Sequence, residues 1–358
     1  MDINVIAPIN DLGYGYTGLH IVDELMKLNH KVCLFPIGQP NCHSRHADNI
    51  RQTLANSDTF SINAPCIRLW HQHDMSMFVG KHVHIGFPIF ELDTFTPKEK
   101  HHLRSCDNLF VCSQWGKDTV DCNLGVLQET DFCKVVPLGV DTSVFTPKKS
   151  TRKPTIFLNV GKWEVRKGHD ILVDMFNYAF NPSDNVELWM MCHNGFLPPE
   201  EQKGWEDRYR NTRLGDKIRF IPRVDTDAQV AEIMQQADCG VFPSRAEGWN
   251  LEALEMMACG KDVIITNYSA HTEFCTNVNS LLVPIDSLEP AFDGKWFFNQ
   301  GNWAKLTTEH LQLFARHMVS IHNAKQSPTG LSLNAEGVKT ANKFTWRNTA
   351  ETIINHLS

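Results

Sequence analysis

Two acidic residues mark the most distinctive stretch of the chain, FPSRAEGWNLEALEMMACG at residues 242–260. Glu247 lies in a predicted loop, and Glu255 lies 8 positions later on the predicted helix that follows. A helix rises about 1.5 Å per residue, so the two carboxylates are predicted to lie roughly 12 Å apart on similar faces. That separation fits two hydroxyl-bearing parts of one extended ligand. The other interpretation is a loop acid and an unrelated acid on a solvated helix face, and spacing alone leaves both open.

The N-terminus of the same helix is a candidate anion site. Its first N–H groups have no partner within the helix, and the helix dipole favours negative charge there. The backbone donors are expected between Gly248 and Leu251. The turn therefore offers both N–H groups and carboxylates to one ligand.

A second charged loop, residues 161–168, carries Lys162, Arg166 and Lys167 directly after a predicted strand at 155–160. Open α/β sheets bind ligands at this end of their strands. Two ammonium groups there suit a diphosphate, which they neutralise as point charges. An ordinary basic surface loop is the alternative interpretation. The P-loop pattern G-x-x-x-x-G-K-[ST] is absent from this loop.

The two loops together favour a nucleotide-sugar as the ligand. Cations and helix N-termini bind phosphate, and carboxylates bind sugar hydroxyls. A nucleotide-sugar contains both groups, and no other ligand that we considered satisfies both loops.

The elements that position these loops alternate between strands and helices along most of the chain, which predicts parallel, doubly wound sheets. The first unit of this kind has a predicted strand at 3–8 and a loop at 10–18 that contains Gly13, Gly15 and Gly18. These glycines match the dinucleotide pattern G-x-G-x-x-G. No acid follows the second strand, so we discount NAD.

A stretch rich in turn and breaker residues, 137–154, is the best candidate for an interdomain linker. We therefore expect two Rossmann-like domains that face each other across a cleft. The expected limits are 1–145 for an acceptor-binding domain, 146–340 for a nucleotide-sugar-binding domain, and 341–358 for a C-terminal helix that packs back toward the first domain. Residues 287–358 are less regular than the rest, apart from predicted helices at 309–322 and 345–357.

Composition narrows the class of protein. The chain has 358 residues and a formal net charge of -7, which argues against a surface that coats nucleic acid. No stretch has the roughly 18 apolar residues that a membrane span needs, so no stable membrane insertion is expected. The 11 cysteines form no C-x-x-C pair, and the N-terminus lacks the features of a signal peptide. These features predict a cytoplasmic protein with reduced thiols.

Several residues resemble metal ligands without completing a site. His71 and His73 form one H-x-H pair, and a second pair includes His84, but no third ligand follows at a recognisable interval. The sequence Asp225-Thr-Asp227 resembles a D-x-D metal motif, although a helix cap near Ala228 explains it better. We predict no metal requirement and no cofactor.

The C-terminal half resembles the retaining, GT-B-fold glycosyltransferases of family 4, the group 1 transferases. Four motifs carry the resemblance, in the family's order: FVCSQWGKDTV at 110–120, VVPLGVDTSVFTP at 135–147, GK-x-x-x-x-KG at 161–168, and E-x7-E from Glu247 to Glu255. Each motif is modest alone, and the four together are specific. The resemblance extends over residues 108–285, with the N-terminal glycine loop as a weaker extension.

The resemblance implies a role for each matching residue. Lys162 and Lys167 would hold the donor diphosphate, Glu247 would contact the donor sugar, and Glu255 would bind the ribose hydroxyls. The remaining donor-binding residues would be Gly13, Gly15, Ser244, Gly248, Trp249, Asn250 and Leu251. On the acceptor side, His71, His84 and Glu91 are weaker candidates, for which a structural role is equally consistent.

The chain departs from the family pattern at three places. Asn250 stands where a glycine is frequent, Gly-Lys-Asp-Val stands at 260–263 in place of G-x-P-V, and residues 268–271 replace a Gly-Gly turn. These changes bear on the choice of nucleotide and sugar more than on the fold.

The implied activity is hexosyl transfer with retention, independent of metal, from a UDP- or GDP-linked donor to an acceptor hydroxyl. The leaving phosphate would accept the proton of that hydroxyl, so no dedicated base is required. The acceptor could be a glycan, a lipid, a protein or a modified nucleic acid. The alternatives are a nucleotide-sugar epimerase or hydrolase on the same fold, and a non-catalytic nucleotide-sugar-binding protein.

Overall fold

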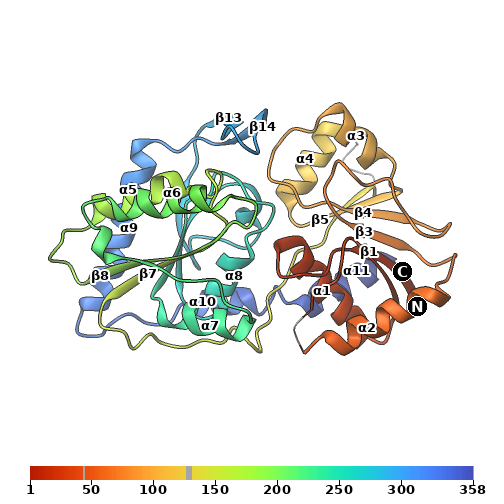
Figure 1. Ribbon diagram of the computed structural model, residues 1–358, viewed down its shortest axis with the longest axis horizontal. Helices are drawn as coiled ribbons and strands as arrows, with labels where there is room; N and C mark the ends of the chain where they lie inside the picture. Colours follow the sequence, from red (N-terminus) through yellow and green to blue (C-terminus); the bar gives the residue numbers. More distant parts are fainter. Residues whose placement is uncertain (43–44, 126–130, 358) are drawn as a thin grey trace. The chain divides into compact units, whose positions relative to one another are not determined.

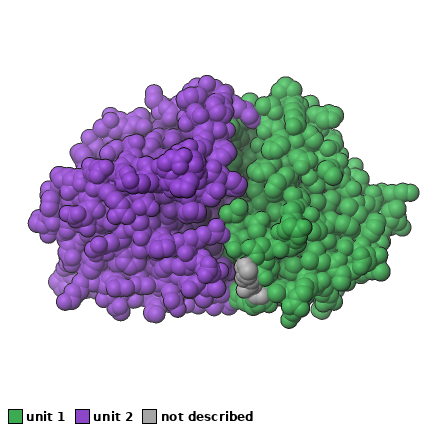
Figure 2. All heavy atoms as spheres, viewed as in Figure 1, with its two compact units in different colours: residues 1–139, 344–358 green, residues 140–343 purple. Residues whose placement is uncertain are grey.

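The computed structural model describes residues 1–42, 45–125 and 131–357. The chain forms two compact units, which Figure 2 shows in different colours. The first unit contains Met1–Gly139 and Phe344–Ser358, and the second contains Val140–Lys343. The first boundary therefore falls at residue 139 where we expected 145, and the second falls at 343 where we expected 340.

The first unit is built on a six-stranded parallel sheet with the strand order β2-β1-β3-β4-β5-β6 (Figure 1). Its strands are β1 (Asp2–Ala7), β2 (Lys31–Pro36), β3 (Cys66–Leu69), β4 (His84–Phe87), β5 (Asn108–Val111) and β6 (Cys133–Val135). Its helices are α1 (Gly13–Lys27), α2 (Ala47–Asn56), α3 (Pro97–Arg104), α4 (Gln114–Leu124) and α11 (Trp346–Leu357), with a 3-10 turn η1 (Ser57–Thr59).

The C-terminal helix α11 belongs to the first unit, where it packs against α1. The indole ring of Trp346 stacks on the imidazole of His20, with 4.9 Å between ring centroids and 8° between planes. Gly139 makes this return possible, because a Cβ atom there would lie only 2.1 Å from the backbone nitrogen of Trp346. The chain thus leaves the first unit at Gly139 and re-enters it at Phe344.

The second unit has its own six-stranded parallel sheet, with the order β12-β11-β10-β7-β8-β9. Its strands are β7 (Thr155–Gly161), β8 (Val186–Cys192), β9 (Ile218–Phe220), β10 (Cys239–Phe242), β11 (Asp262–Asn267) and β12 (Leu281–Pro284). Its helices are α5 (His169–Ala179), α6 (Pro199–Arg210), α7 (Asp227–Gln236), α8 (Leu251–Ala258), α9 (Thr308–Gln326) and α10 (Ala335–Ala341), with 3-10 turns η2 (Gly215–Lys217) and η3 (Ser269–Glu273). The prediction of two parallel, Rossmann-like sheets is confirmed.

The central strands of the second sheet are near-continuous apolar runs, as expected for strands that are buried on both faces. Phe157, Leu188 and Val241 from these strands are fully buried in one core. Helices α5 and α9 contribute Phe176 and Phe314 to the same core. This packing fixes the ends of the strands, from which the candidate site loops extend.

A two-stranded antiparallel hairpin, β13 (Leu288–Phe292) and β14 (Phe298–Ala304), also belongs to the second unit. In Figure 1 it stands out from the body of that unit. The sequence did not predict it, because FNQGNWA at 298–304 has neither the strict alternation nor the β-branched residues that indicate a strand.

The glycine loop expected at 10–18 is wrong in extent, since helix α1 begins at Gly13. Gly15 and Gly18 are helical glycines that allow close packing and have no positive φ angle. A Cβ atom on Gly15 would lie 2.2 Å from Asn10 Oδ1, and one on Gly18 would lie 2.4 Å from the carbonyl oxygen of Pro8. Glycine is therefore required there because the first turns of α1 press against the chain that leaves β1.

Candidate functional site

The two loops singled out by the sequence meet at the topological switch point of the second sheet. From β7 the chain adds β8 and β9 on one side, and then β10, β11 and β12 on the other side. Strands β7 and β10 are parallel neighbours, with Leu158 opposite Gly240. The loops that follow these two strands, residues 162–168 and 243–250, therefore lie side by side. Ligands bind at this position in open α/β sheets.

The Glu247 carboxylate is the centre of a buried network that joins the two loops. Lys167 Nζ donates to Glu247 Oε1 at 3.0 Å, and Arg166 Nη1 donates to Oε2 at 2.7 Å. Ser244 Oγ donates to Oε1 at 2.9 Å. Arg166 also donates to the carboxylate of Glu164 at 2.8 Å. Charged groups from two separate loops are thus held in one fixed arrangement.

Electrostatics keep both members of the central pair charged. Burial alone would raise the pKa of Glu247, but the neighbouring Arg166 and Lys167 hold it well below its usual range. Burial alone would lower the pKa of Lys167, but Glu247 and Glu252 raise it above its usual value. The site therefore contains a fixed ammonium group and a fixed carboxylate that are both nearly inaccessible to solvent.

The N-terminus of α8 begins beside this network. Asn250 adopts the left-handed conformation, with φ 82°, and its side-chain oxygen accepts a hydrogen bond from Ala253 N at 3.2 Å. The backbone N–H groups of Gly248 and Leu251 donate to no other group in residues 1–42, 45–125 and 131–357. Two backbone donors at the start of this helix thus have no partner within the described residues.

A group of residues that the sequence did not identify supports this turn. Asn250 Nδ2 donates to His271 Nε2 at 2.9 Å, and His271 Nδ1 donates to the Thr266 carbonyl oxygen at 2.9 Å. Ser269 is in the left-handed region, with φ 54°, and its hydroxyl oxygen accepts from Glu247 N at 2.8 Å. The departures from the family pattern at Asn250 and at residues 268–271 are therefore in contact with each other. In the sequence, this contact was indicated only by the joint occurrence of the two departures.

Glu255 is buried like Glu247 but differs from it in its partners and in its pKa. It lies within α8, is only 8% exposed, and its carboxylate has no hydrogen-bond or ion-pair partner in the described part of the chain. Burial raises the pKa of Glu255 well above its usual range, and the nearby Glu252 and Asp227 raise it further. An acid whose raised pKa favours the neutral form, able to donate and to accept a hydrogen bond, thus stands on the helix that follows the Glu247 network.

Lys162 lies outside the buried network. Its side chain is 42% exposed and its ammonium group is 3.4 Å from the Glu164 carboxylate. The same ammonium group lies over the ring of Phe196, 5.6 Å from the centroid. Ser244, Glu247, Trp249 and Asn250 are all buried in the second unit, so the structure brings most of the predicted donor residues together and leaves Lys162 at their margin.

The predicted residues of the first unit lie at opposite ends of the strands of its sheet. His71 follows the C-terminal end of β3 and Glu91 follows that of β4. Gly13, which begins α1, lies at the same end of the sheet, after β1. His84 begins β4 and so lies at the opposite edge, where its ring stacks on Phe78 with 4.3 Å between centroids. The structure therefore does not bring His84 together with the other two acceptor-side candidates.

Tyr14 is the residue of this first edge that the sequence did not identify. Its hydroxyl donates to the Ile89 carbonyl and accepts from Ile89 N at 3.2 Å, and its ring centroid is 4.5 Å from that of His71. Burial raises the pKa of Tyr14, and the charge of Glu91 raises it further. Tyr14 follows Gly13 directly, at a position that the glycine pattern leaves unspecified.

The described residues contain no group of three or more His, Cys, Asp and Glu side chains that could hold a metal ion. The D-x-D sequence at 225–227 precedes α7, and the residue that caps this helix is Thr226, whose hydroxyl accepts from Gln229 N. The expected cap is thus present, although it comes from the threonine between the two aspartates.

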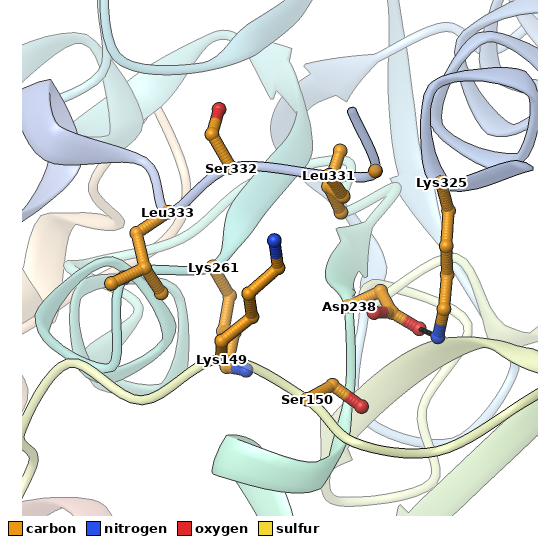
Figure 3. Close-up of a pocket in the computed structure, with 10 residues that line it drawn as sticks. Lys149, Ser150, Asp238, Lys261, Lys325, Leu331, Ser332 and Leu333 are labelled. Atoms are coloured by element: carbon orange, nitrogen blue, oxygen red, sulfur yellow. Dashed lines mark hydrogen bonds and ion pairs between the residues drawn. The ribbon is translucent and has the colours of Figure 1, made fainter. Parts of the chain in front are cut away.

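A pocket of about 160 Å³ lies elsewhere in the second unit (Figure 3). Lys149, Lys261, Lys325 and Asp238 contribute to its lining, and Lys325 Nζ donates to Asp238 Oδ2 at 2.6 Å. Asp238 and Lys261 directly precede β10 and β11, so this pocket lies at the edge where the strands begin. It is therefore separate from the candidate site, which lies where the strands end.

Comparisons with known proteins show what this geometry resembles. A family model described as "Glycosyl transferases group 1" matches residues 154–293, which include both site loops. Mannosylfructose-phosphate synthase of Agrobacterium fabrum is 23% identical over 54% of this chain and 47% of its own length. A D-inositol 3-phosphate glycosyltransferase of Paenarthrobacter aurescens is 30% identical over 39% of this chain and 36% of its own. The chain thus spans less than half the length of these curated relatives.

Solved structures share the whole fold. Sucrose-phosphate synthase from Thermosynechococcus elongatus matches with a TM-score of 0.69 at 16% identity, over 99% of this chain and 98% of that one. Anabaena HepE in complex with UDP-glucose matches with a TM-score of 0.67 at 14% identity, over 99% and 98% of the two chains. The fold is therefore GT-B.

Across the described residues, every helix is too short or too polar to span a bilayer.

Proposed function

Because residues 154–293 match the family model of the group 1 glycosyl transferases, we propose that this protein is a retaining glycosyltransferase. It moves a hexosyl group from a nucleotide-diphosphate donor to an acceptor hydroxyl. The observation that carries the proposal is the buried contact of Lys167 and Arg166 with Glu247, next to the unpaired N–H groups of Gly248 and Leu251. This arrangement combines groups for phosphate with a group for sugar hydroxyls.

The donor is held in three parts under this proposal. Lys162, Lys167 and the N–H groups at the start of α8 bind the diphosphate. Glu247 is ionised and accepts hydrogen bonds from hydroxyls of the donor sugar, while Glu255 is protonated and bonds to the ribose diol. Gly13 and Gly15 of the first unit are also assigned to the donor under this proposal. Donor contacts by Ser244, Trp249 and Asn250 also belong to the proposal.

The reaction follows from these assignments. The bond between the anomeric carbon and the leaving phosphate breaks, and the acceptor oxygen bonds to the same face of the sugar. The proton of the acceptor hydroxyl passes to the leaving phosphate oxygen. Lys162, Lys167 and the α8 N–H groups stabilise the charge that develops on this phosphate. Metal independence is part of the proposal, because these groups supply the positive charge.

UDP- and GDP-linked sugars are the proposed donors. One solved structure of similar fold is described as a complex with UDP-glucose, and a relative that is 26% identical over 44% of this chain is described as GDP-mannose-dependent. The proposed location is the cytoplasm, since all 11 cysteines, which lie in the described residues, are thiols outside any disulfide, as in a reducing compartment.

A donor panel tests the function. The purified chain is incubated with UDP-glucose, UDP-N-acetylglucosamine and GDP-mannose in the presence of EDTA, with and without candidate acceptor glycans. We expect slow release of one nucleoside diphosphate without an acceptor and faster release with one, with the anomeric configuration of the product retained by NMR. An epimerised sugar as the sole product would identify the epimerase alternative. No turnover and no calorimetric binding of UDP or GDP would overturn the proposal.

A further inference from the structure

The tip of the β13–β14 hairpin exposes an unusual number of aromatic side chains. Phe292, Trp296 and Phe298 are 55%, 46% and 64% exposed, and Phe196 from the loop after β8 is 59% exposed. The rings of Phe292 and Phe298 meet edge to face across the two strands, with 6.3 Å between centroids. Exposed aromatic rings that gather at one place mark a binding surface more often than a structural one.

The hairpin is held in place at its tip. Asp293 Oδ1 accepts hydrogen bonds from the backbone nitrogens of Lys295, Trp296 and Phe297 at 2.8, 2.7 and 2.9 Å, which fixes the turn. Lys295 forms an ion pair with Glu201 on α6. The exposed rings therefore stand on a defined turn that is attached to the body of the unit.

The base of the hairpin is attached to a loop of the candidate site. Arg245 lies between Ser244 and Glu247, and its carbonyl oxygen accepts from Ala304 N at 2.9 Å. The Arg245 guanidinium is 3.7 Å from the Glu289 carboxylate and lies over the ring of Trp303. It also pairs in a bidentate manner with Asp170, at 2.8 Å for both contacts. The same residue thus anchors the hairpin and the loop that holds the Glu247 carboxylate.

The aromatic cluster reaches the donor-binding residues through one ring. Phe196 meets Trp296 edge to face at 6.2 Å between centroids, and the Lys162 ammonium lies 5.6 Å from the centre of the Phe196 ring. A ligand that touches the Phe196 and Trp296 rings therefore lies next to a residue assigned to the donor diphosphate.

We propose that Phe196, Trp296, Phe292 and Phe298 form a subsite for the pyranose rings of a glycan acceptor. The assignment to the acceptor rests on the proposed glycosyl transfer. A pyranose ring has a face of C–H bonds that packs on an aromatic ring, and a rim of hydroxyls that stays in solvent. The subsite selects acceptors with more than one sugar residue, since the ring pairs Phe196–Trp296 and Phe292–Phe298 offer more than one aromatic face.

The charges of the hairpin favour a neutral glycan over a membrane surface. Aromatic segments that dock on anionic lipid carry lysines and arginines beside the rings. Residues 286–304 carry three acids, Asp286, Glu289 and Asp293, and a single lysine, Lys295. That lysine already pairs with Glu201. The hairpin thus has the rings of a lipid-binding segment without its positive charge.

Binding of neutral hexasaccharides to the full chain tests the subsite. Maltohexaose, cellohexaose and mannohexaose are titrated at millimolar concentration, and binding is followed by saturation-transfer NMR. We expect at least one of them to bind, and the double variant Trp296→Ala/Phe298→Ala to bind it about fivefold to tenfold more weakly. Trp296→Phe, which keeps a ring, is expected to restore most of the affinity. Tyr178→Ala, which removes a 62% exposed ring from α5, is the matched control and should not change binding.

Three results would overturn the proposal. They are no binding of any hexasaccharide, equal binding by the wild type and the double variant, or sedimentation with phosphatidylglycerol vesicles that the double variant abolishes. Circular dichroism and the midpoint of thermal unfolding show whether each variant is folded. Donor hydrolysis by the wild-type chain is measured separately. Glycan binding without donor hydrolysis would support the subsite and contradict the proposed function. Donor hydrolysis without glycan binding would support the proposed function and contradict the subsite.

Discussion

The two sheets present very different chemistry at the same topological position. At the switch point of the second sheet, Lys167, Arg166 and Glu247 form a buried network of fixed charges. At the C-terminal ends of the strands in the first sheet, the rings of Tyr14, Trp70 and His71 form a cluster, with centroid distances of at most 5.5 Å. A network of fixed charges suits a ligand whose charge is constant, such as a diphosphate. A cluster of rings with few fixed charges suits a ligand that is recognised mainly by shape.

The difference has an energetic consequence. Buried charges that are mutually paired tolerate no loss of a partner, because the remaining charge is then desolvated without compensation. Ring clusters lose packing when one member changes, and that loss is smaller. The two edges should therefore respond differently to matched substitutions.

The largest expected effect is on folding. Glu247→Ala leaves Lys167 and Arg166 buried without their shared carboxylate and should lower the free energy of unfolding by about 3–5 kcal/mol. Glu91→Ala, at the edge of the first sheet, removes a partly exposed acid and should cost less than about 1 kcal/mol. Urea denaturation of both variants measures the contrast, and equal losses would contradict the comparison.

The next effect is on turnover. Lys167→Ala removes a buried ammonium assigned to the leaving phosphate and should lower kcat by about 100- to 1000-fold. Lys203→Ala on α6, whose side chain is 77% exposed, is the control and should retain full activity. Wild-type turnover and nucleotide binding in Lys167→Ala would remove the diphosphate site from this loop.

A third effect depends on pH. Burial lowers the pKa of His169 to about 3 and that of His271 to about 4, against an ordinary value of 6.5. Both stay neutral in the folded state while the unfolded chain takes up two protons as the pH falls from about 6.5 to 4. The second unit should thus lose stability in that window, by up to about 2.7 kcal/mol per pH unit.

The first unit should respond at lower pH. Burial alone would raise the pKa of Asp23, but hydrogen bonds from His46 and Lys27 hold it well below its usual value of 3.8. Its stabilising contribution is complete above that value and is lost only below it. Burial also lowers the pKa of His30, His102 and His356 in the first unit, but less than those of His169 and His271. Hydrogen exchange at pH 7.5 and 5.5 should therefore show faster opening of the second unit at the lower pH, with a smaller change in the first. His271→Gln should reduce the dependence of the free energy of unfolding on pH by the contribution of one proton.

The smallest effect concerns the turn itself. Asn250→Ala replaces a residue that tolerates the left-handed region with one that does so less well, removes the helix cap and leaves His271 without its donor. It should therefore cost about 2–3 kcal/mol. Asn250→Gly keeps the backbone conformation and should cost about 1 kcal/mol. Thermal unfolding measures both variants. If alanine were tolerated as well as glycine, the left-handed conformation would not be the reason for asparagine here.

Sequence reasoning succeeded where the signal was local. Strand-loop-helix patterns located the loops at 161–168 and 243–250, because apolar parallel strands and short basic or glycine-containing turns are visible in a single segment. The network around Glu247 combines residues about 80 positions apart, and sequence patterns placed both loops at strand ends without showing that they touch. Strand order, which makes β7 and β10 neighbours, comes from the fold.

Sequence reasoning failed where tertiary contacts override local patterns. His271 and Ser269 have no motif, and their roles depend on the backbone of the facing turn. Gly15 and Gly18 of α1 matched a loop pattern, yet they serve close packing inside a helix. The β13–β14 hairpin has weak strand propensity and is held by Arg245 and Glu201, which lie far away in the sequence.

The return of the chain at Phe344 has a consequence for how the protein is made. The first unit is discontinuous, so its last helix leaves the ribosome only after the whole of 140–343 has been synthesised. Until then His20 on α1 lacks the indole of Trp346 that covers it in the finished structure. The N-terminal unit, although made first, completes its core last.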